Sequence, residues 1–188
     1  MVVIGHSYVA RLQQFMSAST QLMNFGLSGV EVICLGVGGA TLGSHRNISR
    51  NLPDVAALHP YLIFVHVGEN DVGRMSDRCV VSNLLNFVSQ LSTLCDSGIV
   101  IVGQLIVFPR NSHHQSVNHI NHQLSNRIHH RNIFWRHRRG FRQSSRRLFL
   151  ADRIHLNNIG MQRYWRSVRT IVAGVLRRNH PAFQCQLQ

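Results

Sequence analysis

The sequence contains no lysine and few acidic residues. All 20 basic residues are arginines, only seven Asp and Glu residues oppose them, and the formal net charge is +13. Such an excess favours association with polyanions, because guanidinium pairs bidentately with phosphate or carboxylate and phosphate contacts release counterions. The composition leaves the identity of the polyanion open.

Long apolar runs are also missing. The longest stretches, Tyr61–Val67 and Ile99–Phe108, are strand-length and fall short of the roughly 18 apolar residues of a membrane span. The four cysteines lack the paired spacing of a zinc site, and the start of the chain lacks the regions of a signal peptide. We therefore expect no transmembrane segment and an intracellular location, cytoplasmic or nuclear.

Strand-like and helix-like segments alternate along the chain. The expected strands are Val2–Ile4, Val30–Leu35, Leu62–Val67, Ile99–Phe108 and Ile133–Trp135. The expected helices are Tyr8–Met16, Asn51–Leu58, Arg78–Cys95 capped by Ser76 or Asp77, one within Asn111–His130, and Asn157–Leu176. This alternation predicts a parallel sheet covered on both faces, in a single α/β domain over residues 1–180 with a tail at 181–188.

Four short segments carry the residues with chemical potential. They are VVIGHS at 2–7, GVGGAT at 36–41, VGEND at 67–71 and DRIHLN at 152–157. All lie at expected strand ends or in the loop before a helix, and parallel α/β sheets bind ligands outside the carboxyl ends of their strands. Together they offer a serine, backbone amides, an asparagine amide and an Asp/His pair, which acyl transfer requires.

In this order, the four segments resemble those of the SGNH hydrolase superfamily, also called GDSL-like lipases and esterases. The resemblance covers almost the whole chain and implies a flavodoxin-like three-layer α/β/α sandwich, with a central parallel sheet of about five strands, and no cofactor or metal. It makes Ser7 the nucleophile, His155 the base and Asp152 the carboxylate that orients it. The amides of Ser7 and Gly39 and the side chain of Asn70 then form the oxyanion hole.

These residue types suit hydrolysis of a carboxylic ester. A serine hydroxyl becomes a good nucleophile when an imidazole takes its proton, and a carboxylate fixes the tautomer of that imidazole. Each donor aimed at the developing oxyanion lowers the barrier by roughly 3 to 4 kcal/mol. The predicted function is a serine-dependent esterase, acetylesterase or lipase-like hydrolase of a small ester or acylated substrate, with acyl-chain length and oligomeric state left open.

The first segment departs from the family pattern at one position. It reads Gly-His-Ser where the family usually has Gly-Asp-Ser, so His6 replaces an acidic residue. An imidazole there can change local hydrogen bonding or substrate preference. We expect His6 to be a structural substitute at the turn rather than a second catalytic histidine.

A second functional reading comes from the arginine-rich segment RNIFWRHRRGFRQSSRR at 131–147. Arginine interleaved with aromatic residues suits single-stranded nucleic acid, in which bases stack and phosphates pair, although the run also fits an anionic substrate or a solvated basic surface. The alternative function is a non-catalytic RNA- or DNA-binding module on the same fold. Its candidate residues are Trp135, Arg136, Arg138, Arg139 and Arg142.

Two further features bear on partners and ligands. The Trp-Arg-His-Arg-Gly-Phe stretch of the arginine-rich segment resembles a pattern in SGNH domains encoded in animal mobile elements. His119 and His122 can share a helical face, but no cysteine or carboxylate joins them at metal-ligand spacing. We therefore expect no metal site in this histidine-rich region.

Overall fold

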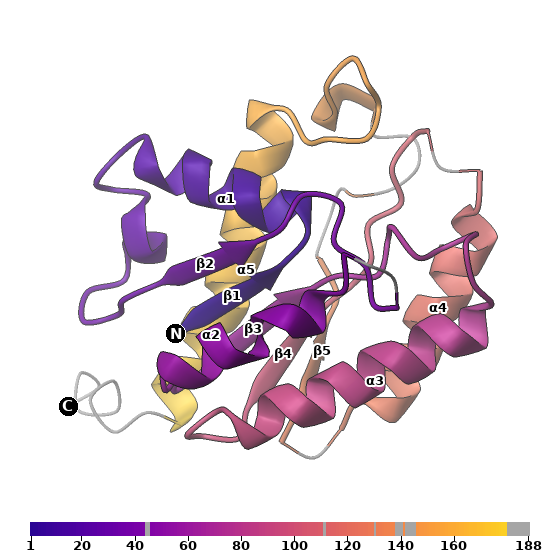
Figure 1. Cartoon of the computed structure of the whole chain (residues 1–188). Helices are drawn as coiled ribbons and strands as arrows, with labels where there is room; N and C mark the ends of the chain where they lie inside the picture. Colours follow the sequence, from indigo (N-terminus) through magenta and orange to yellow (C-terminus); the bar gives the residue numbers. More distant parts are fainter. Residues whose placement is uncertain (44–45, 111, 130, 138–140, 142–145, 180–188) are drawn as a thin grey trace.

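The computed structural model describes residues 1–43, 46–110, 112–129, 131–137, 141 and 146–179. A five-stranded sheet, with all strands parallel and in the order β2-β1-β3-β4-β5, forms its centre (Figure 1). The strands are β1 (Val2–Gly5), β2 (Ile33–Gly36), β3 (Ile63–His66), β4 (Val100–Gly103) and β5 (Ile133–Trp135). The expected parallel sheet is confirmed.

Helices cover both faces of this sheet (Figure 1). The α-helices are α1 (Ser7–Ser17), α2 (Leu52–Ala57), α3 (Asp77–Thr93), α4 (His114–Arg127) and α5 (Asn158–Asn179). The 3-10 helices are η1 (Met23–Gly26), η2 (Ile48–Asn51) and η3 (Arg146–Leu148). Within the described residues, no helix is long and apolar enough to cross a membrane.

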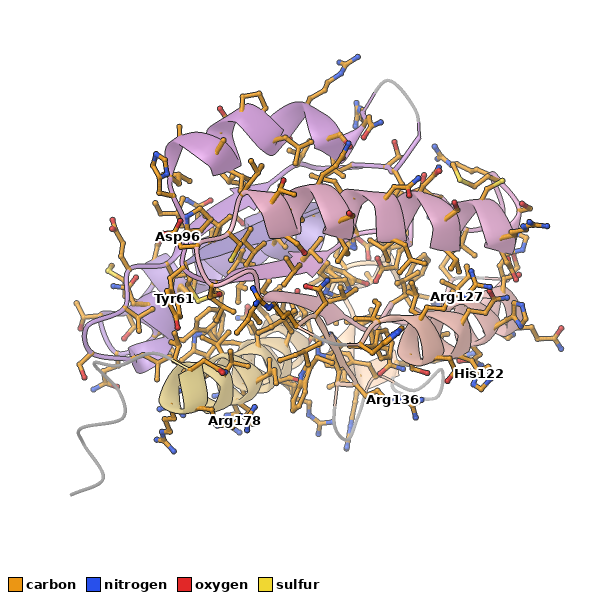
Figure 2. The ribbon with its side chains drawn as sticks, turned by 90° about the horizontal axis from the view of Figure 1, so that it is seen from below. Tyr61, Asp96, His122, Arg127, Arg136 and Arg178 are labelled. Atoms are coloured by element: carbon orange, nitrogen blue, oxygen red, sulfur yellow. The ribbon has the colours of Figure 1, made fainter. Side chains whose placement is uncertain are left out.

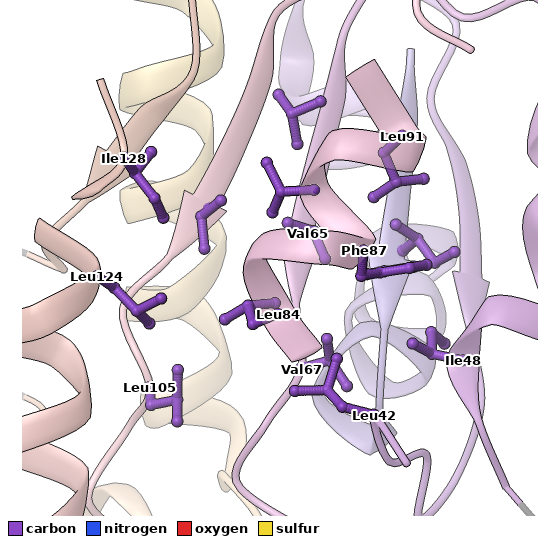
Figure 3. Packing of buried hydrophobic residues seen from close by; sticks show 14 of the residues in the cluster. Leu42, Ile48, Val65, Val67, Leu84, Phe87, Leu91, Leu105, Leu124 and Ile128 are labelled. Atoms are coloured by element: carbon purple, nitrogen blue, oxygen red, sulfur yellow. The ribbon is translucent and has the colours of Figure 1, made fainter. Parts of the chain in front are cut away.

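Alternating side chains of the strands supply two hydrophobic cores, one on each face of the sheet. In β3, Ile63 and Val65 face the core beneath α2, α3 and α4, whereas Phe64 faces the core beneath α1 and α5. Leu84 and Phe87 of α3 pack toward Val65 in the first core (Figure 3). Burial on both faces explains why these strands read as continuous apolar runs.

Three strands are shorter than the sequence predicts, and of these β3 loses one residue at each end. The expected strand Ile99–Phe108 is strand only over Val100–Gly103, because the backbone beyond it pairs with side chains. Asn121 of α4 binds both the N–H and the C=O of Leu105 at 2.9 Å, and Glu69 accepts the N–H of Ile106 at 2.9 Å. β2 begins at Ile33 instead of Val30.

A hydrogen bond from the backbone to a side chain also explains why β2 begins later in the sequence than expected. The N–H of Val32 binds the Asn24 side chain at 3.0 Å, so it is not available to a neighbouring strand. The helix ends differ from the expected ones by a few residues, and Ser76, one of the two expected caps of α3, accepts the N–H of Cys79 at 3.3 Å. The expected tail at 181–188 lies outside the described residues.

Candidate active site

Ser7 lies at the junction of β1 and α1, at the carboxyl edge of the sheet. Gly5 makes this junction possible, since a Cβ there would lie 2.1 Å from the carbonyl oxygen of His66 in β3. Ser7 is half-buried and begins the helix, where backbone N–H groups lack helical partners and favour negative charge. This position suits a serine nucleophile, because its attack on a carbonyl group would form an oxyanion close to these N–H groups.

Asp152 and His155 form a pair in the loop before α5. The Oδ2 atom of Asp152 lies 2.7 Å from Nδ1 of His155, and Oδ1 accepts the N–H groups of Ile154 and His155 at 2.8 and 2.9 Å. The hydrogen bonds to the His155 side chain and to these N–H groups hold the pKa of Asp152 well below its usual value. An ionised carboxylate therefore orients the imidazole of His155, which is partly exposed.

This loop is tied to the start of α1. The hydroxyl of Tyr8 donates a hydrogen bond of 2.7 Å to the carbonyl oxygen of Ile154, so Tyr8 joins the two segments that hold the expected triad. Among the described hydrogen bonds, Ser7 Oγ contacts His6 Nδ1 at 3.4 Å and makes none with His155. Catalytic hydrogen bonds are often long without substrate and tighten in the substrate complex.

The expected oxyanion-hole segments also lie together. The Asn70 amide donates to the carbonyl oxygen of Ala40 at 2.9 Å, and both carboxylate oxygens of Asp71 accept the N–H of Leu42, at 3.1 and 3.0 Å. A carboxamide has two N–H groups, so one of those in Asn70 remains for a substrate oxygen. Gly39 has a φ of 71°, in the left-handed region that favours glycine.

Comparison with known proteins identifies the family. A model of the GDSL-like lipase/acylhydrolase family matches residues 4–163, a range that contains all but the first two residues of the four segments. The chain belongs to this family. No curated protein matches this GDSL-like chain.

Solved structures share the fold of this GDSL-like chain. A member of the lipolytic G-D-S-L family from Veillonella parvula is 16% identical with a TM-score of 0.72, and the match covers 90% of this chain and 96% of that one. A lipase/acylhydrolase from Enterococcus faecalis is 15% identical (TM-score 0.69; coverage 92% and 95%). A carbohydrate esterase of family 3 from Talaromyces cellulolyticus is 15% identical (TM-score 0.65; coverage 95% and 99%).

A buried cluster of polar side chains lies beneath Ser7, and its central member, Glu69, is a site residue that the sequence motifs did not predict. The carboxylate of Glu69 lies 2.8 Å from Nε2 of His6 and 2.7 Å from Nε2 of His66. Burial opposes ionisation, but the charges and hydrogen bonds of His66 and His6 hold the pKa of Glu69 well below its usual value. The available sequence signal was an acidic residue in the short turn that follows an apolar strand.

His6, His66 and Glu69 also bring three potential metal-ligand atoms within 4.8 Å of one another. Hydrogen bonds account for this grouping. The N–H of Tyr8 contacts Nδ1 of His6 at 3.4 Å, which assigns the proton of a neutral His6 to the Nε2 atom that faces Glu69. A nitrogen that carries a proton has no lone pair for a metal.

The arginine-rich segment is only partly a surface feature of this GDSL-like chain. Arg136 is exposed, whereas Trp135 is half-buried, packs against the core beneath α5 and donates its indole N–H to Ser167 at 3.0 Å. The aromatic side chains of this run therefore pack inward instead of forming an open stacking platform. Arg138, Arg139 and Arg142 lie outside the described residues.

Proposed function

We propose that this chain is a serine-dependent carboxylic-ester hydrolase in which Ser7, His155 and Asp152 form the triad. The observation that supports this most directly is the 2.7 Å contact between Asp152 and His155, in a loop bonded through Tyr8 to the start of α1. Membership of an acylhydrolase family supports the reaction class.

The proposed reaction has two parts. His155 removes the proton of Ser7 Oγ as that oxygen attacks the ester carbonyl, and Asp152 stabilises the imidazolium that forms. The amides of Ser7 and Gly39 and the side chain of Asn70 bind the oxyanion, and collapse expels the alcohol with a proton from His155. Water, activated by His155, then attacks the acyl-enzyme and releases the carboxylic acid.

A surface depression of about 500 Å³ between α1 and the start of α5 is our candidate for binding part of the substrate. Leu156 in its lining follows His155, and Arg11 lies one helical turn after Ser7. Its lining combines apolar and polar side chains, namely Arg11, Gln14, Phe15, Ala18, Leu156, Asn158, Ile159, Met161 and Gln162. A small acylated molecule with a polar portion fits this lining chemically.

The first test is hydrolysis of p-nitrophenyl acetate and butyrate by the chain and its Ser7→Ala variant. We expect the variant to lose nearly all turnover, because the substitution removes the hydroxyl group that attacks the ester in the proposed mechanism. Ser17→Ala is the matched control, since it makes the same change at the other end of α1, and it should keep the wild-type rate. Equal rates for wild type and Ser7→Ala would refute the proposal.

Charge supports a second candidate, binding of single-stranded nucleic acid. Within the described residues, the three close contacts between a carboxylate and a basic side chain, His6–Glu69, His66–Glu69 and His155–Asp152, all involve histidines and no arginine. Arginines Arg127 and Arg136 are exposed near α4, on the side seen in Figure 2. Phosphates of a nucleic acid would supply the charges that the protein lacks.

A further inference from the structure

A continuous chain of buried polar groups runs from Ser7 into the centre of the molecule. Ser7 Oγ lies 3.4 Å from His6 Nδ1, and His6 Nε2 lies 2.8 Å from Glu69. On its other side, Glu69 contacts His66 Nε2 at 2.7 Å, and His66 Nδ1 contacts the Tyr164 hydroxyl at 2.7 Å. The side chains of His6, His66 and Glu69 are 4%, 0% and 2% exposed, so water does not screen these contacts.

The hydrogen-bond partners determine where the protons lie. The N–H of Tyr8 donates to His6 Nδ1, which must therefore carry a lone pair, and the proton of His6 sits on Nε2 and points at Glu69. The N–H of Ile106 donates to the other oxygen of Glu69 at 2.9 Å. Donors approach the carboxylate from three sides, and such bonds favour its ionised form.

His6 is badly placed to be the base itself. It is 3% exposed, and its Nδ1 atom is shared by the Ser7 hydroxyl and the Tyr8 N–H, both at 3.4 Å. His155, by contrast, has a side chain that is 27% exposed at the edge where a substrate arrives. A buried imidazole beside the nucleophile can still hold the first turn of α1, and with it Ser7, in place.

We propose that His6 and Glu69 are positioning residues for Ser7, an inference that rests on the esterase function proposed above. Glu69 holds His6 in the tautomer whose Nδ1 lone pair accepts the Tyr8 N–H, and this contact fixes the first turn of α1, where Ser7 lies, while the Ser7 proton remains available to His155. Without the carboxylate, the proton can move to Nδ1, which then repels the Tyr8 N–H and shifts the first turn of α1.

A double-mutant cycle tests this role. His6→Asn replaces the Nδ1 acceptor with an amide oxygen that has no tautomer, and asparagine is a favourable N-cap. We expect Glu69→Gln to lower kcat about 100-fold when His6 is present, the size of effect of a misplaced reacting group. In the His6→Asn background, the same substitution should change kcat less than about threefold, because the two residues are coupled. KM should change little throughout.

Two variants complete the series. His6→Gln keeps a donor toward Glu69 but loses the cap acceptor, so it should lower kcat as much as Glu69→Gln. Glu31→Gln is the control, because it makes the same chemical change at an exposed position. An equal effect of Glu69→Gln in both backgrounds would overturn the proposal, since Glu69 would then act without His6.

A second measurement does not depend on catalysis. Nitrogen-15 NMR of labelled histidines distinguishes protonated from unprotonated ring nitrogens, with the His6→Asn spectrum assigning the signals of His6. We expect an unprotonated Nδ1 in the wild type and a tautomer mixture in Glu69→Gln, recorded while both proteins are folded. The other groups facing this pair are Tyr8, His66, Asp71, Tyr164 and His137, and all of them are present in both proteins. Because His66 also loses its contact with Glu69, the comparison uses the signals assigned to His6.

The two readouts separate the two proposals. If the wild type hydrolyses no ester but shows the expected tautomers and their change in Glu69→Gln, the esterase function fails while the Glu69–His6 arrangement stands. If the tautomer of His6 is the same in wild type and Glu69→Gln, the positioning role is refuted whatever the turnover.

Discussion

At the scale of single residues, a substitution at Asp152 separates an effect on turnover from an effect on folding stability. Its carboxylate orients His155, yet its side chain is 38% exposed and contributes nothing to the core. Asparagine keeps an oxygen that can accept the N–H groups of Ile154 and His155, but its amide cannot stabilise an imidazolium. Asp152→Asn therefore tests the contribution of the negative charge alone.

We expect Asp152→Asn to lower turnover of p-nitrophenyl acetate by about 10⁴-fold while leaving Tm nearly unchanged. Asp54→Asn, at an exposed position in α2, is the control and should retain wild-type turnover. Near-normal turnover of Asp152→Asn would mean that the triad is misassigned.

Glu69 should make the stability of the protein depend on pH. Its pKa in the folded protein lies well below the usual value of 4.5, so the ionised carboxylate stabilises the folded state above that pH. This stabilisation is lost as the pH falls below 4.5 toward the folded pKa, because the unfolded chain then binds the proton first.

The measurement is Tm of wild type and Glu69→Gln against pH. We expect Glu69→Gln to be less stable near neutral pH by about 2–4 kcal/mol, because two buried histidines lose their anionic partner. The difference should shrink as the pH falls through the range below about 5. Asp71, whose pKa is raised to about 6 mainly by burial and in part by the charge of Glu69, titrates in the wild type above the range in which this difference shrinks. A difference that is constant with pH would contradict an ionised Glu69.

At the scale of elements, α4 is attached to the sheet by a polar contact as well as by its apolar face. Asn121 is buried and serves both backbone groups of Leu105, which replaces the strand pairing that the sequence predicted there. Removing the Asn121 side chain leaves a buried donor and a buried acceptor without partners.

We expect Asn121→Ala to lower the free energy of unfolding by about 2–6 kcal/mol, since each of the two unpaired buried groups costs about 1–3 kcal/mol. Asn126→Ala, on the exposed face of the same helix, should cost less than about 0.5 kcal/mol. Urea denaturation of the two variants measures both values. Similar midpoints would show that Leu105 finds other partners.

At the scale of the whole molecule, the excess of arginine predicts a salt-dependent affinity for nucleic acid. The double variant Arg127→Ala/Arg136→Ala should bind single-stranded RNA more weakly than wild type in a filter-binding titration. If each arginine contacts one phosphate, the slope of log affinity against log salt should fall by about 1.4.

The matched control removes the same charge elsewhere. Arg74→Ala/Arg78→Ala changes two exposed arginines near the start of α3, far along the chain from the arginine-rich segment. It should weaken binding less than Arg127→Ala/Arg136→Ala. Equal losses would indicate a diffuse effect of net charge, and unchanged affinity in both would exclude this face as the binding surface.

Much of the architecture was determined by the sequence alone, because its signals are local. Continuous apolar runs and helical periodicity predicted five strands and the helices between them, since burial on both faces of a sheet requires such runs. The closeness of Asp152 and His155 was equally predictable, because they are three residues apart in one short loop. Proximity along the chain needs no knowledge of the fold.

Only the tertiary structure decided the contacts between distant residues. Glu69 meets His6 because β1 and β3 are neighbours in the sheet, and across a sequence separation of 63 positions no local signal predicts that the two residues pair. The end of β4 depends on Asn121 and Glu69, side chains from elsewhere in the chain that compete for its backbone. The reason is general: periodicity reports which face of an element is buried, but which buried polar groups meet depends on strand order and packing.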